Sequence, residues 1–171
     1  IKRYLKKYPI TFMQATPLSW KVLLKQGWNN DGAIKILVGG EAFTTKMAEQ
    51  LNYHKGNVWN VYGPTETSMW SMANHLKGKL STESVPLGAP LNNTVIMVLN
   101  DELKPVIPGA QGELYIAGIG LARGYLNQVE LTNQKFIIHP KTNERLYKTG
   151  DLVFMHDEKT ICYVGRIDTQ L

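Results

Sequence analysis

The sequence predicts an α/β fold in two parts, a largely parallel sheet with helices followed by a smaller β-rich part. Residues 1–77 alternate short apolar runs with segments of helical periodicity, which is typical of a parallel sheet covered by helices. From residue 78 onward, Gly and Pro punctuate short β-prone runs, which is typical of a small β-barrel or a twisted sheet. The length of 171 residues and the apolar share of 43% suit one ordinary domain.

The first part is expected to follow the order strand, helix, strand, helix, strand. Its strands are the apolar runs at residues 10–13, 34–38 and 58–61. The first helix is expected to begin at Thr16 and Pro17, because Pro is tolerated in a first helical turn, and to stop at Gly27. The second is expected over about residues 44–54, with a threonine cap.

The second part is expected to consist of strands joined by turns. The strands are predicted at residues 95–99, 113–117, 152–155 and 160–164. Turns are expected at residues 100–101 and 157–159, where Asn and Asp side chains can hydrogen-bond their own backbone. Cys162 is the single cysteine, which excludes an internal disulfide and a cysteine-cluster metal site, and its apolar neighbours favour a core role.

The net charge of +5 does not indicate a nucleic-acid partner. Much of the excess comes from the basic residues among the first seven, and the remaining Lys and Arg are scattered among acids. No basic stripe with interleaved aromatic residues occurs, so a solvated surface is the preferred interpretation. No run of 18 apolar residues occurs either, so no membrane span is expected.

The stretch Asn60-Val61-Tyr62-Gly63-Pro64-Thr65-Glu66-Thr67 carries the strongest chemical signal. A short apolar run ends there at a Gly-Pro break, and a hydroxyl and a carboxylate follow at once. The hydroxyl can donate to a phosphate oxygen, and the carboxylate can hold Mg²⁺, which prefers oxygen ligands. A tight turn with a solvated Glu explains the same residues. Residues 39–41 end the preceding strand, and neighbouring parallel strands present ligands at their carboxyl ends, which favours a shared site.

Four collinear stretches resemble core motifs of adenylate-forming enzymes, and most closely those of the adenylation domains of nonribosomal peptide synthetases. The stretch at 60–66 resembles the fifth motif. Residues 112–118, with their continuation at 121–125 and 131–132, resemble the sixth motif. Residues 147–152 resemble the seventh motif, and residues 165–170 resemble the eighth. The resemblance covers nearly the whole chain, and four motifs in the right order are far more specific than one.

The resemblance implies an internal fragment of a larger domain. Residues 1–77 would be the C-terminal part of an α/β subdomain that carries the nucleotide and substrate site, and 78–166 a β-barrel-like subdomain. Residues 167–171 would begin the hinge to a missing C-terminal domain, with Asp168 as the hinge residue. The family's upstream phosphate loop, its amine-binding aspartate and its downstream lysine have no match here, so the fragment alone is expected to be inactive.

The reaction that the resemblance implies is amino-acid activation. The enzyme would form aminoacyl-AMP from ATP and an amino acid with Mg²⁺, and would pass the acyl group as a thioester to phosphopantetheine on a separate carrier domain. The implied partners are the peptidyl carrier and condensation domains of one assembly line in the cytoplasm, with no nucleic acid and no membrane. The alternatives are an acyl- or aryl-acid ligase of the same superfamily and a non-catalytic nucleotide-binding scaffold.

The family's site residues carry over to matching positions. Thr65 would bind the α-phosphate, and Glu66 would ligate Mg²⁺. The adenine would lie between Tyr62 and Tyr163, beside the backbone of Gly39, Gly40 and Glu41, and Asn60 would bind its amino group. Asp151 would accept from the ribose hydroxyls, and Arg166 would reach the ribose or a phosphate. Judged without the motifs, Tyr163 equally fits a core position, and Asp151 fits an ordinary turn.

Six residues would form the wall of the substrate pocket. They are Gln14, Leu37, Gly39, Val61, Met69 and Trp70. The bulky Met69 and Trp70 would fill the cavity and so favour a small substrate by exclusion. Glycine is the predicted substrate, with alanine as the next choice. Other residues of chemical interest are interpreted as structural or surface residues, namely Arg123, Tyr125, Trp28, His54 and His75.

Overall fold

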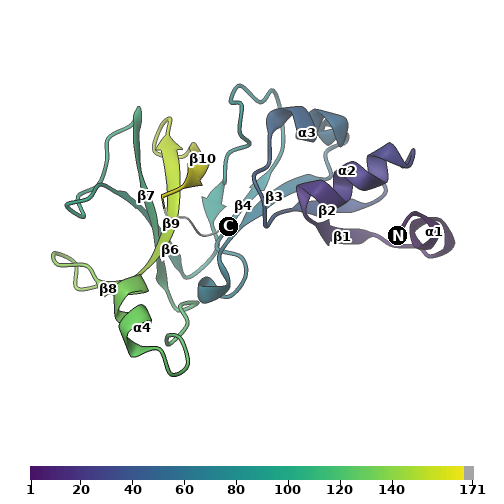
Figure 1. Ribbon diagram of the computed structural model, residues 1–171. Coiled ribbons are helices and arrows are strands. Elements are labelled where there is room, and N and C mark those ends of the chain that lie inside the picture. The colour runs from purple at the N-terminus through teal and green to yellow at the C-terminus, as the bar shows by residue number, and fades with distance from the viewer. Residues whose placement is uncertain (168–171) are drawn as a thin grey trace.

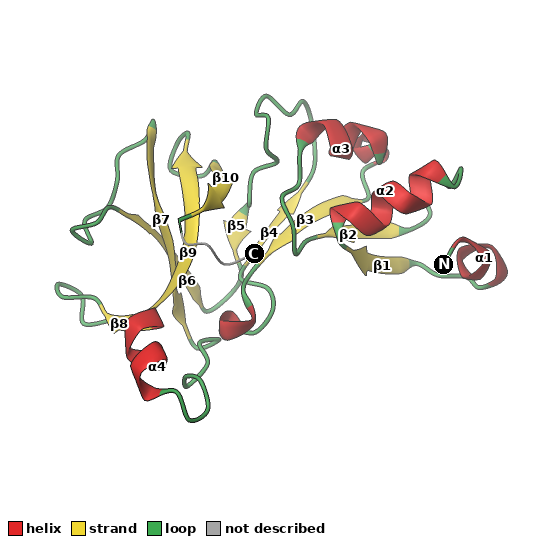
Figure 2. Ribbon diagram, viewed as in Figure 1, coloured by secondary structure: helices red, strands yellow, loops and turns green. Residues whose placement is uncertain are grey.

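A computed structural model describes residues 1–167 as two sheets, one carrying helices and the other curled (Figure 1). The first sheet has the strand order β1-β2-β3-β4-β5, and the second has the order β10-β9-β7-β6, with β8 also paired to β9. Figure 2 shows that most helical residues accompany the first sheet, whereas the second is almost entirely strand and loop. The predicted α/β class with a following β-rich part is confirmed.

The first sheet is parallel in its first three strands. These are β1 (Phe12–Ala15), β2 (Lys35–Val38) and β3 (Val58–Tyr62). The strands β4 (Met72–His75) and β5 (Ala89–Pro90) extend the sheet in antiparallel fashion. The sheet therefore continues beyond residue 77, while the division of the chain at that residue stays a prediction.

Short helices cover one face of this sheet. They are α2 (Pro17–Lys25) and α3 (Thr45–Gln50), and Leu5 of α1 (Lys2–Lys7) packs against the same core. Single 3-10 turns follow α3 and β3, as η1 (Tyr53–Lys55) and η2 (Thr65–Thr67). The Thr16 hydroxyl accepts from the Ser19 amide and the Thr44 hydroxyl from the Met47 amide, so the predicted threonine caps are present. Apolar residues of α2 and α3, such as Trp20 and Met47, pack with Ile36 of β2 in one core.

The second sheet is antiparallel throughout. It consists of β6 (Thr94–Leu99), β7 (Ala110–Gly118), β8 (Phe136–Ile138), β9 (Arg145–Met155) and β10 (Ile161–Arg166), and a helix, α4 (Val129–Lys135), precedes β8. Its strands curl into a half-barrel, and in the described residues β6 and β10 stand at the two ends of the strand order rather than paired to each other. Cys162 is buried, as expected.

Several predicted element boundaries were wrong. The first strand lies at Phe12–Ala15 rather than 10–13, because its pairing with β2 runs from Phe12 and Lys35 to Ala15 and Val38. The helix predicted over 44–54 ends at Gln50, since Asn52 adopts a left-handed φ of 51°. The strand predicted at 152–155 is the last third of the much longer β9, which passes through Gly150 at a φ of 74°.

The two sheets are joined by a shared apolar core. Met72 of β4 and Leu87 pack with Leu114, Val153 and Ile161 of the second sheet. On the other face of the second sheet, a separate cluster contains Leu99, Tyr115, Ala117 and Leu146. The alternation of neighbouring β7 residues between these clusters shows that both faces of the strand are buried. Within residues 1–167, no helix has both the length and the apolar character needed to cross a membrane.

Candidate functional site

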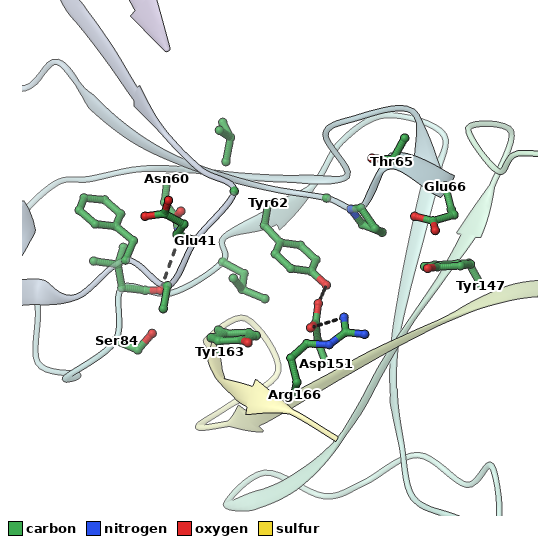
Figure 3. A pocket seen from close by; sticks show the side chains of 18 residues that line it. Glu41, Asn60, Tyr62, Thr65, Glu66, Ser84, Tyr147, Asp151, Tyr163 and Arg166 are labelled. Atoms are coloured by element: carbon green, nitrogen blue, oxygen red, sulfur yellow. Dashed lines mark hydrogen bonds and ion pairs between the residues drawn. The ribbon is translucent and has the colours of Figure 1, made fainter. Parts of the chain in front are cut away.

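A cavity of about 590 Å³ lies where the end of the first sheet meets the second sheet. Figure 3 shows Tyr62 pointing into it from the first sheet, opposite Asp151, Tyr163 and Arg166 of the second sheet, with Thr65 and Glu66 on the neighbouring turn. Every residue predicted for catalysis or nucleotide binding, except Gly39, lines this cavity. Residues from motifs about 90 positions apart in the sequence therefore share one site, as their predicted roles require, although the roles themselves stay predictions.

Asp151 is the centre of a hydrogen-bond network on the floor of the cavity. The Tyr62 hydroxyl donates to its Oδ2, and Arg166 Nη1 donates to its Oδ1 at 2.9 Å. The backbone amide of Asp151 donates to Thr149 Oγ1 at 3.0 Å, and this hydroxyl donates in turn to the Leu114 carbonyl at 2.6 Å. With only 7% of its surface exposed, Asp151 is a buried, oriented carboxylate rather than a solvated turn residue.

The tyrosines at the cavity remain neutral hydrogen-bond donors. Burial raises the pKa of Tyr62 well above its ordinary value, and the negative charge and hydrogen bond of Asp151 raise it further. Burial also raises the pKa of Tyr163, with a smaller contribution from the Asp151 charge. Neutral aromatic rings on either side of an oriented carboxylate suit a planar base attached to a sugar with adjacent hydroxyls.

Asn60 is fixed by the loop that precedes β5. It is buried, and its Nδ2 donates to the Pro86 carbonyl at 3.0 Å, as does Nδ2 of Asn74. Because the amide nitrogen is engaged, the amide oxygen is the atom that would accept from a ligand amino group. Glu41, which also lines the cavity, has one carboxylate oxygen bound to the Leu18 amide at 3.2 Å.

Thr65 and Glu66 lie on η2, directly after the Gly63-Pro64 break. Gly63 is required there, because a Cβ at this position would lie 2.6 Å from the Met69 carbonyl oxygen and 2.7 Å from the Ser71 amide nitrogen. The Glu66 carboxylate accepts from the Tyr125 hydroxyl at 2.6 Å. Tyr125, interpreted from the sequence as a packing residue rather than a ligand, thus also contacts a predicted catalytic group through its hydroxyl.

The residues near Glu66 fit Mg²⁺ held jointly with a substrate. Among the described residues, no group of three His, Cys, Asp or Glu side chains could hold a metal ion by itself. Mg²⁺ commonly uses one or two carboxylates together with phosphate oxygens and water. The carboxylate of Glu66 and the hydroxyl of Thr65 supply the oxygen donors that such a shared site needs.

The predicted substrate-pocket residues are only partly brought together. Gln14 is aligned with Leu37 across β1 and β2, and Leu37 with Trp59 across β2 and β3, which puts them on one face of the sheet. Gly39 faces Val61 and Trp70 so closely that a Cβ would lie 2.5 Å from the Val61 carbonyl oxygen and 3.0 Å from Trp70 Cη2.

Two of these six residues stand apart from the rest. Met69 is 62% exposed, so its side chain does not fill the site in this structure. Val61 is the member of the set that also lines the large cavity. The assignment of all six to a substrate pocket stays a prediction, and the predicted hinge residue Asp168 lies outside the described residues.

Sequence reasoning missed Tyr147, which lines the cavity near Glu66 (Figure 3). Its hydroxyl lies 3.5 Å from that of Tyr125. Burial raises the pKa of Tyr147, and Tyr125 and Glu66 raise it further, so it also remains a neutral phenol. A signal was present, because Tyr147 opens the stretch 147–152 that also contains Asp151.

Comparison with known proteins identifies the family. Residues 1–126 match the family of AMP-binding enzymes. The chain is 39% identical over 173 residues to a dimodular nonribosomal peptide synthase of Bacillus subtilis, covering 100% of this chain and 7% of that protein. It is 36% identical to tyrocidine synthase 3 of Brevibacillus parabrevis, covering 98% of this chain and 3% of the synthase. The chain thus spans less than a tenth of these relatives.

Solved structures agree with this match. The structure of the four-domain nonribosomal peptide synthetase AB3403, bound to AMP and glycine, superimposes on this chain with a TM-score of 0.87 at 41% sequence identity. The match covers 98% of this chain and 13% of AB3403. The N-terminal subdomain of NpsA from Klebsiella oxytoca, in complex with 3-hydroxybenzoyl-AMSN, gives a TM-score of 0.80 at 27% identity, over 96% of this chain and 43% of that one. The chain therefore belongs to the AMP-binding enzyme family, in the branch of nonribosomal peptide synthetase adenylation domains.

Proposed function

We propose that this chain forms part of the site at which a nonribosomal peptide synthetase activates a small amino acid, glycine in the first instance, with ATP. The observation that carries the proposal is the Asp151 network, which combines an oriented carboxylate with a neutral tyrosine and an arginine in one cavity. One carboxylate with two acceptor oxygens suits the two hydroxyls of a ribose. The 41% identical synthetase bound to AMP and glycine supports both substrates.

The proposed reaction needs positioning and charge neutralisation more than covalent help from the protein. A carboxylate oxygen of the amino acid attacks the α-phosphorus of ATP, and the bond to the leaving pyrophosphate breaks. The Thr65 hydroxyl would donate to an α-phosphate oxygen, and the Glu66 carboxylate would hold Mg²⁺. When bound, Mg²⁺ supplies positive charge to the crowded phosphate oxygens. The adenine would lie between Tyr62 and Tyr163, with its amino group donating to Asn60 Oδ1.

The second half-reaction would release AMP. The thiol of a phosphopantetheine arm on a carrier domain would attack the carbonyl carbon of the mixed anhydride. A thioester forms, the bond from the acyl carbon to the AMP phosphate oxygen breaks, and the thiol proton leaves to solvent. The proposal includes a peptidyl carrier domain and a condensation domain as partners in one assembly line, in the cytoplasm, the compartment that supplies ATP.

The size of the substrate is proposed from the contact between Gly39 and Trp70. A Cβ on Gly39 would lie 3.0 Å from Trp70 Cη2, so the indole occupies the space next to Gly39 and would limit the size of a substrate side chain there. Each methylene excluded from such a pocket is worth about 1–3 kcal/mol of discrimination. A second candidate function, activation of an aryl acid, is favoured by the fold similarity to NpsA in complex with 3-hydroxybenzoyl-AMSN.

The test is substrate-dependent exchange of pyrophosphate into ATP by the full-length protein that carries this chain. The panel comprises the twenty amino acids and a set of benzoic acids, with Glu66→Ala as the control. Exchange with glycine that is lost in Glu66→Ala supports the proposal in full. Exchange with a large amino acid would overturn the pocket assignment, and exchange with a benzoic acid alone would favour the aryl-acid ligase. Absence of exchange with every acid would leave a nucleotide-binding scaffold.

A further inference from the structure

A loop of the second sheet lies against the turn that carries Glu66. The Ala122 amide donates to the Glu66 carbonyl at 2.7 Å, and the Ser68 hydroxyl donates to the Gly120 carbonyl at 2.8 Å. The approach is close, since a Cβ at Gly120 would lie 3.2 Å from the Thr67 carbonyl oxygen. The backbone from Glu66 to Ser68 is therefore held by a segment more than 50 residues further along the chain.

The same loop also supplies a hydrogen bond to the Glu66 side chain. The Tyr125 hydroxyl donates to Glu66 Oε1 at 2.6 Å, a distance typical of a hydroxyl bound to a charged carboxylate. Such charge-assisted bonds are roughly twice as strong as bonds between neutral groups. One carboxylate oxygen is thereby held on the side of the second sheet, which restricts the orientation of the carboxylate.

The backbone around Tyr125 is itself held by hydrogen bonds from neighbouring elements. Its backbone amide donates to Thr132 Oγ1 of α4 at 2.9 Å. The Arg145 guanidinium donates to the carbonyls of Ala122 and Arg123 at 2.8 and 2.9 Å and lies over the Phe136 ring, 4.5 Å from its centroid. The loop is thus tied to α4, β8 and β9, so the Tyr125 hydroxyl is presented by a supported backbone.

We propose that Tyr125 is a positioning residue, whose hydroxyl orients the Glu66 carboxylate so that its other oxygen meets the cation bound with the nucleotide. The inference rests on the proposed function, because it assigns Glu66 to a divalent cation. Groups that hydrogen-bond a metal-binding carboxylate fix its orientation, and their loss commonly weakens metal affinity or activity by 10- to 100-fold. The sixth motif would then serve the cation site through Tyr125, although no residue of this motif is predicted to contact the nucleotide.

The substitution Tyr125→Phe separates positioning from packing. The ring contacts Phe136 with the centroids 5.8 Å apart, and this contact remains when only the hydroxyl is removed. A matched control is Tyr115→Phe, because the Tyr115 hydroxyl also donates to a glutamate, Glu113 Oε2, at 3.1 Å. Tyr115 lies in the separate apolar cluster of the second sheet and does not line the cavity.

The experiment measures Mn²⁺ binding to the full-length protein in the presence of ATP, by electron paramagnetic resonance of the free ion. We expect Tyr125→Phe to weaken Mn²⁺ binding by about tenfold and to raise the Mg²⁺ concentration for half-maximal pyrophosphate exchange, with the KM for the amino acid unchanged. Tyr115→Phe should leave the Mn²⁺ affinity, the Mg²⁺ concentration for half-maximal exchange and the KM for the amino acid unchanged. In a Glu66→Gln background, Tyr125→Phe should cause no further loss of Mn²⁺ binding.

The outcomes separate this inference from the proposed function. If the wild type exchanges pyrophosphate and Tyr125→Phe binds Mn²⁺ as well as the wild type does, the positioning role is overturned and the proposed function stands. Equal losses in Tyr125→Phe and Tyr115→Phe would also overturn it, because the effect would then be a general one on the sheet. A wild type that exchanges with no acid overturns the proposed function itself.

Discussion

The Tyr62 hydroxyl donates to the Asp151 carboxylate across 89 positions of sequence. Tyr62 ends β3 of the first sheet and Asp151 lies in β9 of the second, so this bond joins the two sheets at the floor of the cavity. The adjoining apolar contacts of Met72 and Leu87 with the second sheet support the same junction. Stability and site geometry are therefore linked at this pair.

Tyr62→Phe should destabilise the protein by about 1.5–3 kcal/mol, the usual contribution of a hydrogen bond to a charged group. Urea unfolding followed by tryptophan fluorescence measures the change. Tyr163→Phe serves as the control, since Tyr163 lines the same cavity from β10 and is only half-buried. Equal destabilisation by the two substitutions would show that the Tyr62–Asp151 bond has no particular role.

Alkaline pH should destabilise the folded protein progressively above about pH 10, the ordinary pKa of tyrosine. Burial raises the pKa of Tyr62, Tyr125, Tyr147 and Tyr163, so the folded state favours the neutral phenols. A raised folded-state pKa gives stability that is complete below the unfolded pKa and is lost as the pH rises through the folded one.

The measurement is the urea midpoint at pH values from 8 to 11. Tyr62→Phe should show a shallower decline above about pH 10, because it lacks one of the perturbed groups. A flat midpoint across this range in the wild type would contradict the assignment of raised pKa values.

Gly39→Ala should destabilise the protein by about 1–3 kcal/mol through overpacking. The added methyl would meet the Val61 carbonyl oxygen at 2.5 Å, and backbone of the adjoining strand cannot move aside cheaply. Gly165→Ala is the matched control, since a Cβ there meets no atom within 4 Å. Thermal unfolding compares the two, and a similar loss at both sites would refute the steric explanation.

Trp70→Ala should shift substrate preference toward larger amino acids if the Gly39 contact sets pocket size. Removal of the indole opens space beside Gly39 and Val61, so kcat/KM for alanine or valine should rise relative to glycine. Pyrophosphate exchange with the full-length protein gives these ratios. Met69→Ala should have a smaller effect, because its side chain is largely exposed. Unchanged ratios in Trp70→Ala would remove this residue from the pocket.

Local patterns predicted the elements whose causes are local. The threonine caps of α2 and α3 arise from a side chain and an amide three residues apart. The apolar runs of β2 and β3 supply residues that are buried in the structure, namely Ile36, Val38, Val58 and Val61. The turn at Asn100 was predictable for the same reason, since its Oδ1 accepts from the amides of Glu102 and Lys104.

Features that depend on distant partners were less accessible to sequence reasoning. β4 was missed, because its MANH sequence gains its strand form from pairing with β3. α4 was missed as well, since none of its residues is buried and no apolar stripe marks it. The contact between Tyr125 and Glu66 spans 59 positions, whereas the motif residues predicted for catalysis and nucleotide binding, except Gly39, line one cavity.

The distance along the chain between the two sheets has a consequence for synthesis. A ribosome adds about 5–20 residues per second, so about 4 to 18 s separate the emergence of Tyr62 from that of Asp151. Throughout that interval Met72 lacks Val153 and Ile161, its apolar neighbours from the second sheet. The nascent chain therefore carries an uncovered apolar edge of its first sheet, the kind of surface that chaperones protect, until β9 and β10 have left the exit tunnel.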